Sequence, residues 1–278
     1  MASASLVQAL RASKPAFGAW ITMPGALHAR TVAASSPHLS WITLDCEHGM
    51  ISLLPGVSEA IQAVSSLGSS APSAIVRVPA TGACADTSTS WQIKQALDAG
   101  ARGIMVPMVS TSAQAQAVVA AARFPPKGIR GFGSPFTDSV WGITPSEYLA
   151  TANDGILVLV QIETRDAMTN LDGILSVDGL DGVLIGPYDL SLSHGYPPPS
   201  PDPHPEVELM IQKIREGAHA KGKKCAMFCT TGSQAAKRAE QGFDMINVIS
   251  DASALTQGLA QNLATAAGQI APPKSVGY

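Results

Sequence analysis

Short apolar runs and longer helix-like stretches alternate along the whole chain. The runs are rich in β-branched and aliphatic residues, the stretches are rich in Ala, Gln and Leu, and Gly or Pro separates many of them. The pattern predicts strands at 17–23, 41–47, 73–79, 103–109, 156–163, 182–187, 224–229 and 244–250. It predicts helices at 27–36, 53–68, 88–98, 111–124, 165–176, 205–222, 231–241 and 253–268. Eight βα units in this order predict an α/β fold whose parallel sheet closes as a (β/α)8 TIM barrel.

The length of the chain favours one domain. It has 278 residues, close to the ~250 of a single barrel, so we expect 1–278 to form one barrel domain. A doubly wound open sheet is the structural alternative, but nothing in the pattern marks the edge or the switch point that it requires. Two segments interrupt the alternation, a small polar loop at 80–90 and a long Pro- and Gly-rich excursion at 125–147. Loops of this length are usually functional, whereas the tail at 272–278 is expected to fray.

Composition restricts the possible partners. A net charge of −3 and a pI near 6.0 provide no basic surface for nucleic acid or an anionic membrane. No stretch approaches the ~18 apolar residues of a membrane span, and the N-terminal residues lack a secretory pattern. Only 14% of the residues are charged, against about 25% in typical globular proteins. This predicts that other subunits cover part of the surface.

The cysteines indicate a reducing compartment. Cys46, Cys84, Cys225 and Cys229 show neither a Cys-x-x-Cys motif nor a matching His spacing. Cys225 and Cys229 lie four residues apart in a strand-like run and should face the same side, as a buried pair does. We therefore expect structural thiols in a cytoplasmic protein.

Polar side chains collect at the carboxyl ends of neighbouring predicted strands. They are Asp45, Glu47 and His48 after the second strand, Arg77 near the end of the third, Gln161 and Glu163 at the end of the fifth, and Asp189 after the sixth. In a parallel barrel these strand ends form one rim, and that rim is where the chemistry is done. Four acids beside one Arg leave negative charge uncompensated, and adjacent carboxylates repel unless a proton or a cation lies between them. A hard divalent ion bound by Glu163 and Asp189 would remove the deficit.

Each of these residues also has a plain structural explanation when it is taken alone. His48 could stabilise a loop, Arg77 could pair with a strand-end acid, Gln161 could be a buried amide, and Asp189 could cap the next helix. Strand-end charges that occurred by chance would scatter over both rims. Their convergence at one rim therefore favours a functional site.

Asp98 adds a further observation. It lies at the end of the predicted helix 88–98, where an acid is unfavourable by roughly 0.3–1 kcal/mol because of the helix dipole. Such violations of local rules tend to occur where function requires them. A carboxylate held against an imidazole would orient it and raise its basicity, so Asp98 is a candidate partner of His48.

Several motifs in one order make a family resemblance specific. They are Leu-Asp-Cys-Glu-His (44–48), Val-Arg-Val-Pro (76–79), Gln-Ile-Lys-Gln-Ala-Leu-Asp-Ala-Gly (92–100), Val-Pro-Met-Val (106–109), Phe-Pro-Pro-Lys-Gly-Ile-Arg-Gly-Phe-Gly-Ser (124–134), Val-Gln-Ile-Glu-Thr (160–164) and Ile-Gly-Pro-Tyr-Asp-Leu-Ser (185–191). Together they resemble the HpcH/HpaI class II pyruvate aldolase family, which includes 4-hydroxy-2-oxoheptanedioate aldolase. The similarity runs from about residue 15 to residue 265, and the stretches 45–49 and 131–136 also resemble macrophomate synthase.

The resemblance implies a barrel of the phosphoenolpyruvate/pyruvate-binding type with a defined set of roles. Mg2+, Mn2+ or Co2+ would be bound by Glu163 and Asp189, an essential His48 would be tuned by Asp98, and Arg77 would lie beside the developing enolate oxygen. Gln161, Ser134 and the backbone around Tyr188 would contact the keto acid, and Asp45 would lie near metal-bound water. The resemblance also implies a homo-hexamer built as a dimer of trimers.

The implied reaction is the reversible aldol cleavage of a 4-hydroxy-2-oxo acid to pyruvate and an aldehyde. His48, directly or through a metal-bound water or hydroxide, is the expected base. No lysine stands at a strand end among the motifs, which argues against a Schiff-base aldolase. Cys46, Tyr188 and the longer 80–90 loop depart from common members of the family and leave the aldehyde open.

Three other functions remain as alternatives. Oxaloacetate decarboxylation, as in an enzyme like macrophomate synthase, needs the metal and Arg77 but little from His48. Cleavage of a citramalyl-CoA-type substrate would need a basic groove for phosphates, and no Lys/Arg cluster beside the rim supports one. A non-catalytic keto-acid-binding protein is disfavoured because every role in the site is filled.

Overall fold

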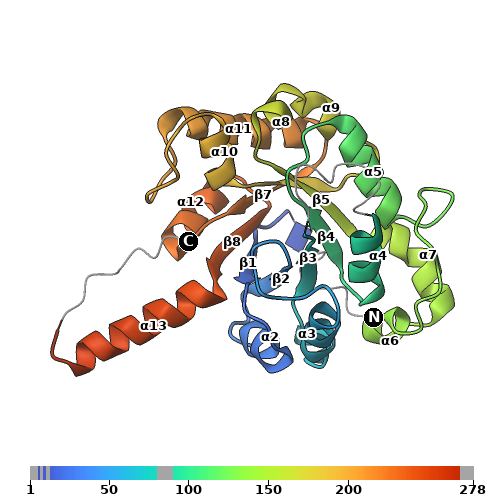
Figure 1. The fold of residues 1–278 in the computed structure, drawn as a ribbon, viewed down its shortest axis with the longest axis horizontal. Coiled ribbons are helices and arrows are strands. Elements are labelled where there is room, and N and C mark those ends of the chain that lie inside the picture. The colour runs from blue at the N-terminus through green and yellow to red at the C-terminus, as the bar shows by residue number, and fades with distance from the viewer. Residues whose placement is uncertain (1–5, 7–8, 11–12, 80–89, 270–278) are drawn as a thin grey trace.

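The structure, a computed structural model, describes residues 6, 9–10, 13–79 and 90–269. Among these residues, eight parallel strands close into a barrel in chain order (Figure 1). They are β1 (Ala16–Ile21), β2 (Leu39–Asp45), β3 (Ser73–Arg77), β4 (Gly103–Val106), β5 (Leu157–Ile162), β6 (Gly182–Ile185), β7 (Lys224–Phe228) and β8 (Met245–Ser250). Every predicted strand overlaps an observed one. The (β/α)8 prediction is confirmed, and the open sheet is excluded because β1 pairs with both β2 and β8.

Helices surround the strands (Figure 1). Those that follow the predicted alternation are α2 (Ala26–Ala33), α3 (Gly56–Ser65), α4 (Ser90–Asp98), α5 (Ser112–Ala122), α8 (Arg165–Thr169), α9 (Leu171–Leu175), α11 (Pro205–Ala220), α12 (Gly232–Glu240) and α13 (Asp251–Ala266). The other helical segments are the 3-10 turn η1 (Gly68–Ser70) and the helices α6 (Thr137–Trp141), α7 (Pro145–Gly155) and α10 (Pro187–Ser193). The predicted helix 165–176 is divided into α8 and α9 at Asn170.

The prediction of a continuous loop over 125–147 was partly wrong, because this segment contains α6 and the start of α7. Thr144 and Glu147 form a capping box at the start of α7, and Pro145 occupies its first turn. The other segment expected to be irregular, 80–90, lies outside the described residues except for Ser90, which begins α4. The tail 272–278 also lies outside them.

Alternate strand residues fill the barrel and lead up to the rim. The interior cluster includes Trp20, Trp41, Ile75, Met105, Leu159 and Leu184, while the opposite strand faces pack under the helices as a second cluster. A Cβ atom at Gly18 would lie 2.2 Å from the Trp41 ring, so a glycine is needed for Trp41 to fill the interior. Because side chains alternate along a strand, Ile75 and Arg77 share the inward face of β3. The apolar interior therefore ends in polar side chains at the carboxyl rim.

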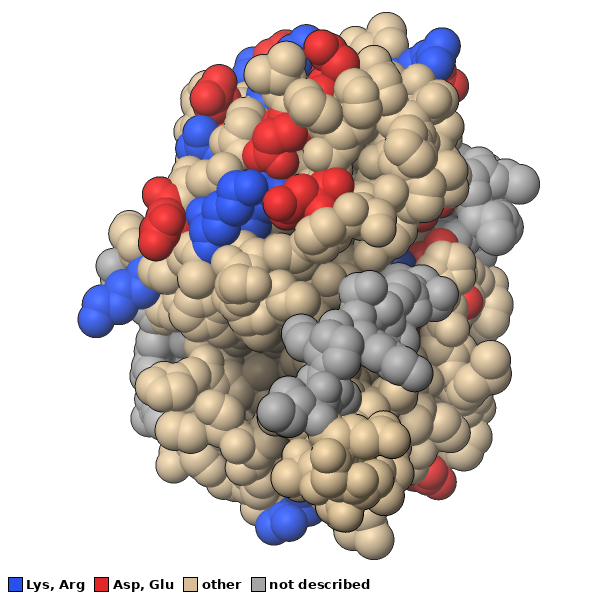
Figure 2. Space-filling model, turned by 90° about the vertical axis from the view of Figure 1, so that its left-hand side faces the viewer, with Lys and Arg blue, Asp and Glu red and all other residues tan. Residues whose placement is uncertain are grey.

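Helix α13 extends away from the barrel (Figure 1). Its first residue, Asp251, is 6% exposed and is held by Thr22, Met23 and His28 beyond the end of β1. Asp251 is also the one charged residue between 251 and 269. The face on which α13 lies shows few charged side chains in its lower part (Figure 2). This face therefore contributes to the low proportion of charged residues in the chain.

The cysteines that the structure describes are Cys46, Cys225 and Cys229, and they are buried and unpaired, whereas Cys84 lies outside the described residues. Burial raises the pKa of Cys46 and of Cys229 to about 12, so both thiols stay protonated at neutral pH. The described cysteines therefore behave as structural residues. Over the described part of the chain, no helix combines the length and apolarity needed to cross a bilayer.

Candidate active site

A cavity of about 160 Å³ opens at the carboxyl rim of the barrel. Its lining residues are Trp20, His48, Arg77, Gln161, Glu163, Leu184, Gly186, Pro187, Tyr188, Asp189 and Phe228. Most of the site residues predicted from the sequence are among them. The cavity places acids, an amide, a guanidinium and an imidazole opposite a group of apolar rings.

Arg77 is fixed by two carboxylates. Its Nε donates to Asp45 Oδ1 (2.8 Å) and its Nη2 donates to Asp45 Oδ2 (2.6 Å), while Nη1 lies 2.9 Å from Glu47 Oε2. Burial alone would raise the pKa of Asp45, but the hydrogen bonds and the charge of Arg77 outweigh it and hold that pKa below its ordinary value. The guanidinium is therefore a preoriented positive charge at the base of the cavity.

Asp45 has little capacity left for another partner. It is fully buried, and besides Arg77 it accepts hydrogen bonds from Trp20 Nε1 (3.1 Å) and from the backbone N–H groups of Glu47 (3.0 Å) and His48 (3.3 Å). The structure thus gives Asp45 a positioning role, holding Arg77 and the turn that carries His48. The contact with metal-bound water that was predicted for Asp45 stays a prediction.

Glu47 was noted at the strand end but was given no role in the predicted site. The structure places it between Arg77 and His48, whose Nε2 lies 3.7 Å from Glu47 Oε2. Burial raises the pKa of Glu47 to about 8, and the charges of Glu163 and Asp189 add to the effect. Asp45 and Glu47 lie two residues apart at the strand end, and this spacing was the sequence signal that Glu47 could be a second partner of Arg77. His48 itself is open, with its side chain 57% exposed.

Glu163 follows β5 and is held from two sides. Gln161 Nε2 donates to its Oε2 (2.6 Å), and the backbone N–H of Met108 donates to its Oε1 (2.7 Å). Met108 has a φ of 59°, a left-handed conformation that is uncommon for a non-glycine residue and tends to persist at functional sites. Burial raises the pKa of Glu163 to about 7. The chain therefore uses a strained backbone position to keep a buried carboxylate in place.

Asp189 completes the acidic side of the cavity. It lies in the first turn of α10, after the N-cap Gly186. Burial is the main cause of the raised pKa of Glu163 and of Glu47, and the charge of Asp189 adds to it in both cases. Asp189 is exposed whereas Glu163 is 2% exposed, so one carboxylate lies at the mouth and the other at the base.

This donor set fits a divalent cation. Glu163, Asp189 and Gln161 line the same cavity, and Gln161 Oε1 is buried without a hydrogen-bond partner among the described residues. Carboxylate and amide oxygens are the ligands that hard divalent ions prefer. In the described part of the chain, no three His, Cys, Asp or Glu side chains converge as a metal cage. The fit is thus to an open site, with two protein carboxylates and positions left for other ligands.

The structure places Asp98 and Ser134 apart from this cavity. Asp98 is paired with Arg130 Nη2 (2.9 Å) and with Lys94, and Ser134 Oγ donates to the Asp98 carbonyl (3.1 Å). The positive charge of Arg130 offsets the unfavourable interaction between Asp98 and the negative end of the helix dipole. Asp98 and Ser134 instead line a separate small pocket with Phe124. Within one chain the structure brings neither residue to His48, and the roles predicted for both stay predictions.

Sequence reasoning missed an apolar wall on the other side of the cavity. Trp20 and Phe228 meet edge to face at 5.2 Å, and Tyr188 and Phe228 do so at 6.4 Å. The Arg77 guanidinium lies over the Trp20 ring at 4.9 Å from its centroid. The alternation along β1 and β7 was the available signal, because it turns Trp20 and Phe228 inward at the strand ends.

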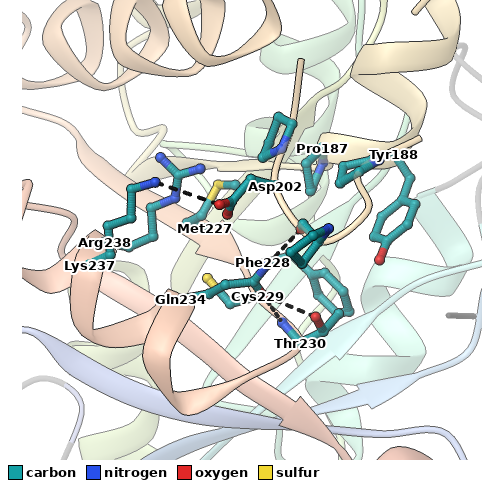
Figure 3. A pocket seen from close by; sticks show the side chains of 13 residues that line it. Pro187, Tyr188, Asp202, Met227, Phe228, Cys229, Thr230, Gln234, Lys237 and Arg238 are labelled. Atoms are coloured by element: carbon teal, nitrogen blue, oxygen red, sulfur yellow. Dashed lines mark hydrogen bonds and ion pairs between the residues drawn. The ribbon is translucent and has the colours of Figure 1, made fainter. Parts of the chain in front are cut away.

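A second, smaller pocket lies behind this wall (Figure 3). Pro187, Tyr188 and Phe228 line both spaces, and the far side of the second pocket carries Lys237 and Arg238. Its volume is about 20 Å³. The wall therefore separates the main cavity from a space that holds little more than a water molecule.

Comparison with known proteins agrees with this geometry. The family model for HpcH/HpaI aldolase/citrate lyase matches residues 18–257. A hydroxypyruvate/pyruvate aldolase of Rhizorhabdus wittichii is 37% identical over 253 residues, which cover 91% of this chain and 94% of that protein. A 4-hydroxy-2-oxo-heptane-1,7-dioate aldolase of Klebsiella pneumoniae is 40% identical over 221 residues, 77% of each chain. The crystal structure of macrophomate synthase superimposes with a TM-score of 0.81 at 25% identity, covering 95% of this chain and 88% of that one. The chain belongs to the HpcH/HpaI aldolase/citrate lyase family.

Proposed function

We propose that this protein is a divalent-metal-dependent pyruvate aldolase, a carbon–carbon lyase that cleaves a 4-hydroxy-2-oxo acid reversibly to pyruvate and an aldehyde. The observation that carries the proposal is the meeting of Glu163, Asp189 and Arg77 in one cavity of a chain that belongs to an aldolase family. Breaking the bond between C3 and C4 leaves an enolate, which needs positive charge at its oxygen and a base at the C4 hydroxyl.

Glu163 and Asp189 are the residues that would hold the ion, which we expect to be Mg2+, Mn2+ or Co2+. When bound there, the ion would supply Lewis-acid polarisation of the keto group of the 2-oxo acid. Gln161 positions Glu163 through its amide nitrogen, and its Oε1 is buried without a hydrogen-bond partner among the described residues. These residues therefore define the pyruvate end of the substrate.

Arg77 stabilises the charge that develops on the enolate oxygen. Its position is fixed by Asp45 and Glu47 before substrate arrives, so little reorganisation is needed during the reaction. Preoriented charge of this kind is usually the largest single contribution to catalysis, and removing one donor typically costs about 10²–10³ in kcat.

His48 accepts the proton of the C4 hydroxyl. Its imidazole lines the cavity at the open side, where the part of the substrate beyond the keto acid would lie. A positioned base contributes typically 10²–10⁴ in rate. In the reverse direction the same imidazole returns the proton to the alkoxide of the aldehyde carbon.

Oxaloacetate decarboxylation is the second candidate. The residues that stabilise an enolate are complete without His48, which is mostly exposed and approaches no described carboxylate more closely than 3.7 Å. Loss of CO2 requires no proton to be removed from a hydroxyl group. The same cavity is therefore suited to decarboxylation with Arg77 and the two acids alone.

We also propose that the protein is a homo-oligomer, expected to be a hexamer. Leu255, Leu259 and Leu263 recur every four residues on α13 and are 54%, 55% and 67% exposed. Burying a leucine side chain is worth roughly 1.5–3 kcal/mol, so this stripe favours association with another subunit. The unpaired buried thiols support the expected cytoplasmic location.

A metal-reconstitution assay tests the proposed function. Enzyme stripped with chelator is given Mg2+, Mn2+ or Co2+, then pyruvate and a panel of aldehydes, and the products are identified by mass. We expect aldol products only after metal is restored. Full activity of the stripped enzyme in chelator would contradict the metal site, and oxaloacetate decarboxylation without any aldol product would favour the second candidate.

A further inference from the structure

The geometry of the apolar wall points to the aldehyde substrate, an inference that rests on the proposed function. We infer that Tyr188 and Phe228 select aldehydes with an uncharged apolar or aromatic body and disfavour aldehydes that carry a second carboxylate. The acids, Gln161 and Arg77 are used by the pyruvate half and His48 by the C4 hydroxyl, so the wall is what remains for the body of the aldehyde.

The wall is built as an aromatic recognition surface. Trp20 and Phe228 are nearly perpendicular at 88°, and Tyr188 and Phe228 at 72°, so each ring fixes the next. Trp20 is 1% exposed and Phe228 is 7% exposed, whereas Tyr188 is half-buried beside the mouth. Aromatic pairs of this geometry favour a further ring or apolar chain against them, because both the edge and the face of a ring can be used.

The space behind the wall does not extend the cavity. Pro187, Tyr188 and Phe228 close off a pocket of only about 20 Å³ (Figure 3). Lys237 and Arg238 lie on the far side of that pocket. Arg238 is already bound to Glu208 (2.5 and 2.7 Å), so the nearest cations beyond the wall are separated from the substrate or engaged.

Charge in the cavity disfavours a second carboxylate. Among the described lining residues Arg77 carries the fixed positive charge, and it is shared between Asp45 and Glu47. Glu163 and Asp189 line the same space, and the positive charge of the ion that they would hold is taken by the pyruvate half. A distal carboxylate on the aldehyde would thus lose its hydration without gaining a cation of its own, which is costly in a partly enclosed site.

A comparison of three aldehydes tests the inference: butanal and 4-oxobutanoate have the same chain length and differ in the carboxylate, and benzaldehyde carries an aromatic ring. Butanal, 4-oxobutanoate and benzaldehyde are each condensed with saturating pyruvate and Mn2+, and kcat/KM for each aldehyde is compared. We expect wild type to favour benzaldehyde and butanal over 4-oxobutanoate by at least about tenfold. One apolar group in such a pocket is worth about 10–200-fold. Tyr188→Ala and Phe228→Leu should reduce the ratio of benzaldehyde to 4-oxobutanoate by about tenfold, while Tyr188→Phe keeps it.

Controls separate this inference from the proposed function. Phe136→Leu removes a ring that is 62% exposed and lies outside the cavity, so its ratio should match wild type. Exchange of the pyruvate methyl protons with D2O by wild type reports the pyruvate half alone. If wild type exchanges the methyl protons but prefers 4-oxobutanoate, the inference is overturned while the proposed function stands. The same holds if it exchanges them but Tyr188→Ala and Phe228→Leu both leave the ratio of benzaldehyde to 4-oxobutanoate unchanged. No exchange overturns both.

Discussion

Gly186 limits how the buried carboxylate of the site can be arranged. A Cβ atom at this position would lie 2.2 Å from Glu163 Oε2 and 3.3 Å from the Glu163 Cβ and Cδ atoms. To reach ordinary contact at 3.4 Å the carboxylate must move by about 1 Å. Its bonds to Gln161 (2.6 Å) and Met108 (2.7 Å) cannot both survive that movement. We therefore predict that Gly186→Ala misplaces Glu163.

The magnitude follows from the size of the displacement. A shift of 1 Å in a catalytic constellation costs about 10² in rate, and overpacking costs about 1–3 kcal/mol in stability. Gly186→Ala should therefore lower kcat/KM for aldol cleavage by about 10²-fold and weaken Mn2+ binding in calorimetric titration. Gly232→Ala is the matched control, because Gly232 likewise lies at the start of a helix that follows a strand, and a Cβ there meets nothing within 4 Å. Metal affinity and kcat/KM in Gly186→Ala within about threefold of the control would show that Gly186 does not set the position of Glu163.

Three further predictions follow from other parts of the structure. His48→Ala should depress aldol cleavage by at least about 10²-fold while sparing oxaloacetate decarboxylation far more, because only cleavage removes a hydroxyl proton; equal losses in the two steady-state assays would contradict this. Burial raises the pKa of Glu163 from its ordinary 4.5 to about 7, so the folded metal-free enzyme binds this proton more tightly than the unfolded chain does. The stability that this proton contributes is fully present below pH 4.5 and is lost as pH rises through about 7. Because metal competes with that proton, the rise in Tm caused by Mn2+ should grow between about pH 5 and pH 8, and a pH-independent rise in thermal scans would argue against it. Leu259→Asp should shift the protein toward smaller species in light scattering, and an unchanged mass would show that α13 makes no subunit contact.

The fold was accessible from sequence because each strand combines β-branched residues with clear boundaries. Val158, Val160 and Ile162, for example, lie in a run bounded by Gly155 and Thr164. The helices α6 and α7 were missed because the prolines and glycines of 125–147 obscured them. The capping signal of Thr144 and Glu147 lay within that segment and outweighed its loop-like composition.

The polar half of the site was predictable, whereas strand alternation was the one signal for the apolar half and did not mark it as part of a site. Arg77, Glu163 and Asp189 are charged residues at strand ends or just after them, and the barrel brings those ends together. Trp20 and Phe228 look like ordinary core residues in the sequence, and only the closure of β8 onto β1 places the rings in one wall.

Asp98 shows a different limit of sequence reasoning. Its unfavourable position at the end of α4 was recognised, but its partner Arg130 lies 32 residues further along the chain. The residue that neutralises a misplaced charge is set by tertiary packing, and Arg130 is held there over Phe124 and by the Tyr148 hydroxyl. Local spacing points to one partner, Lys94, four residues earlier in α4, but the buried partner Arg130 is set by tertiary packing.

Exchange of the pyruvate methyl protons with D2O, followed by proton NMR, directly reports whether the enzyme forms the pyruvate enolate. Exchange requires the enolate and a base for the methyl proton but no aldehyde, so it tests the enolate stabilisation that Glu163, Asp189 and Arg77 are proposed to supply. We predict rapid exchange in the Mn2+-, Mg2+- or Co2+-loaded enzyme and at least about 10²-fold slower exchange after chelation or in Arg77→Met. Exchange at the full rate in metal-free enzyme or in Arg77→Met would contradict the account.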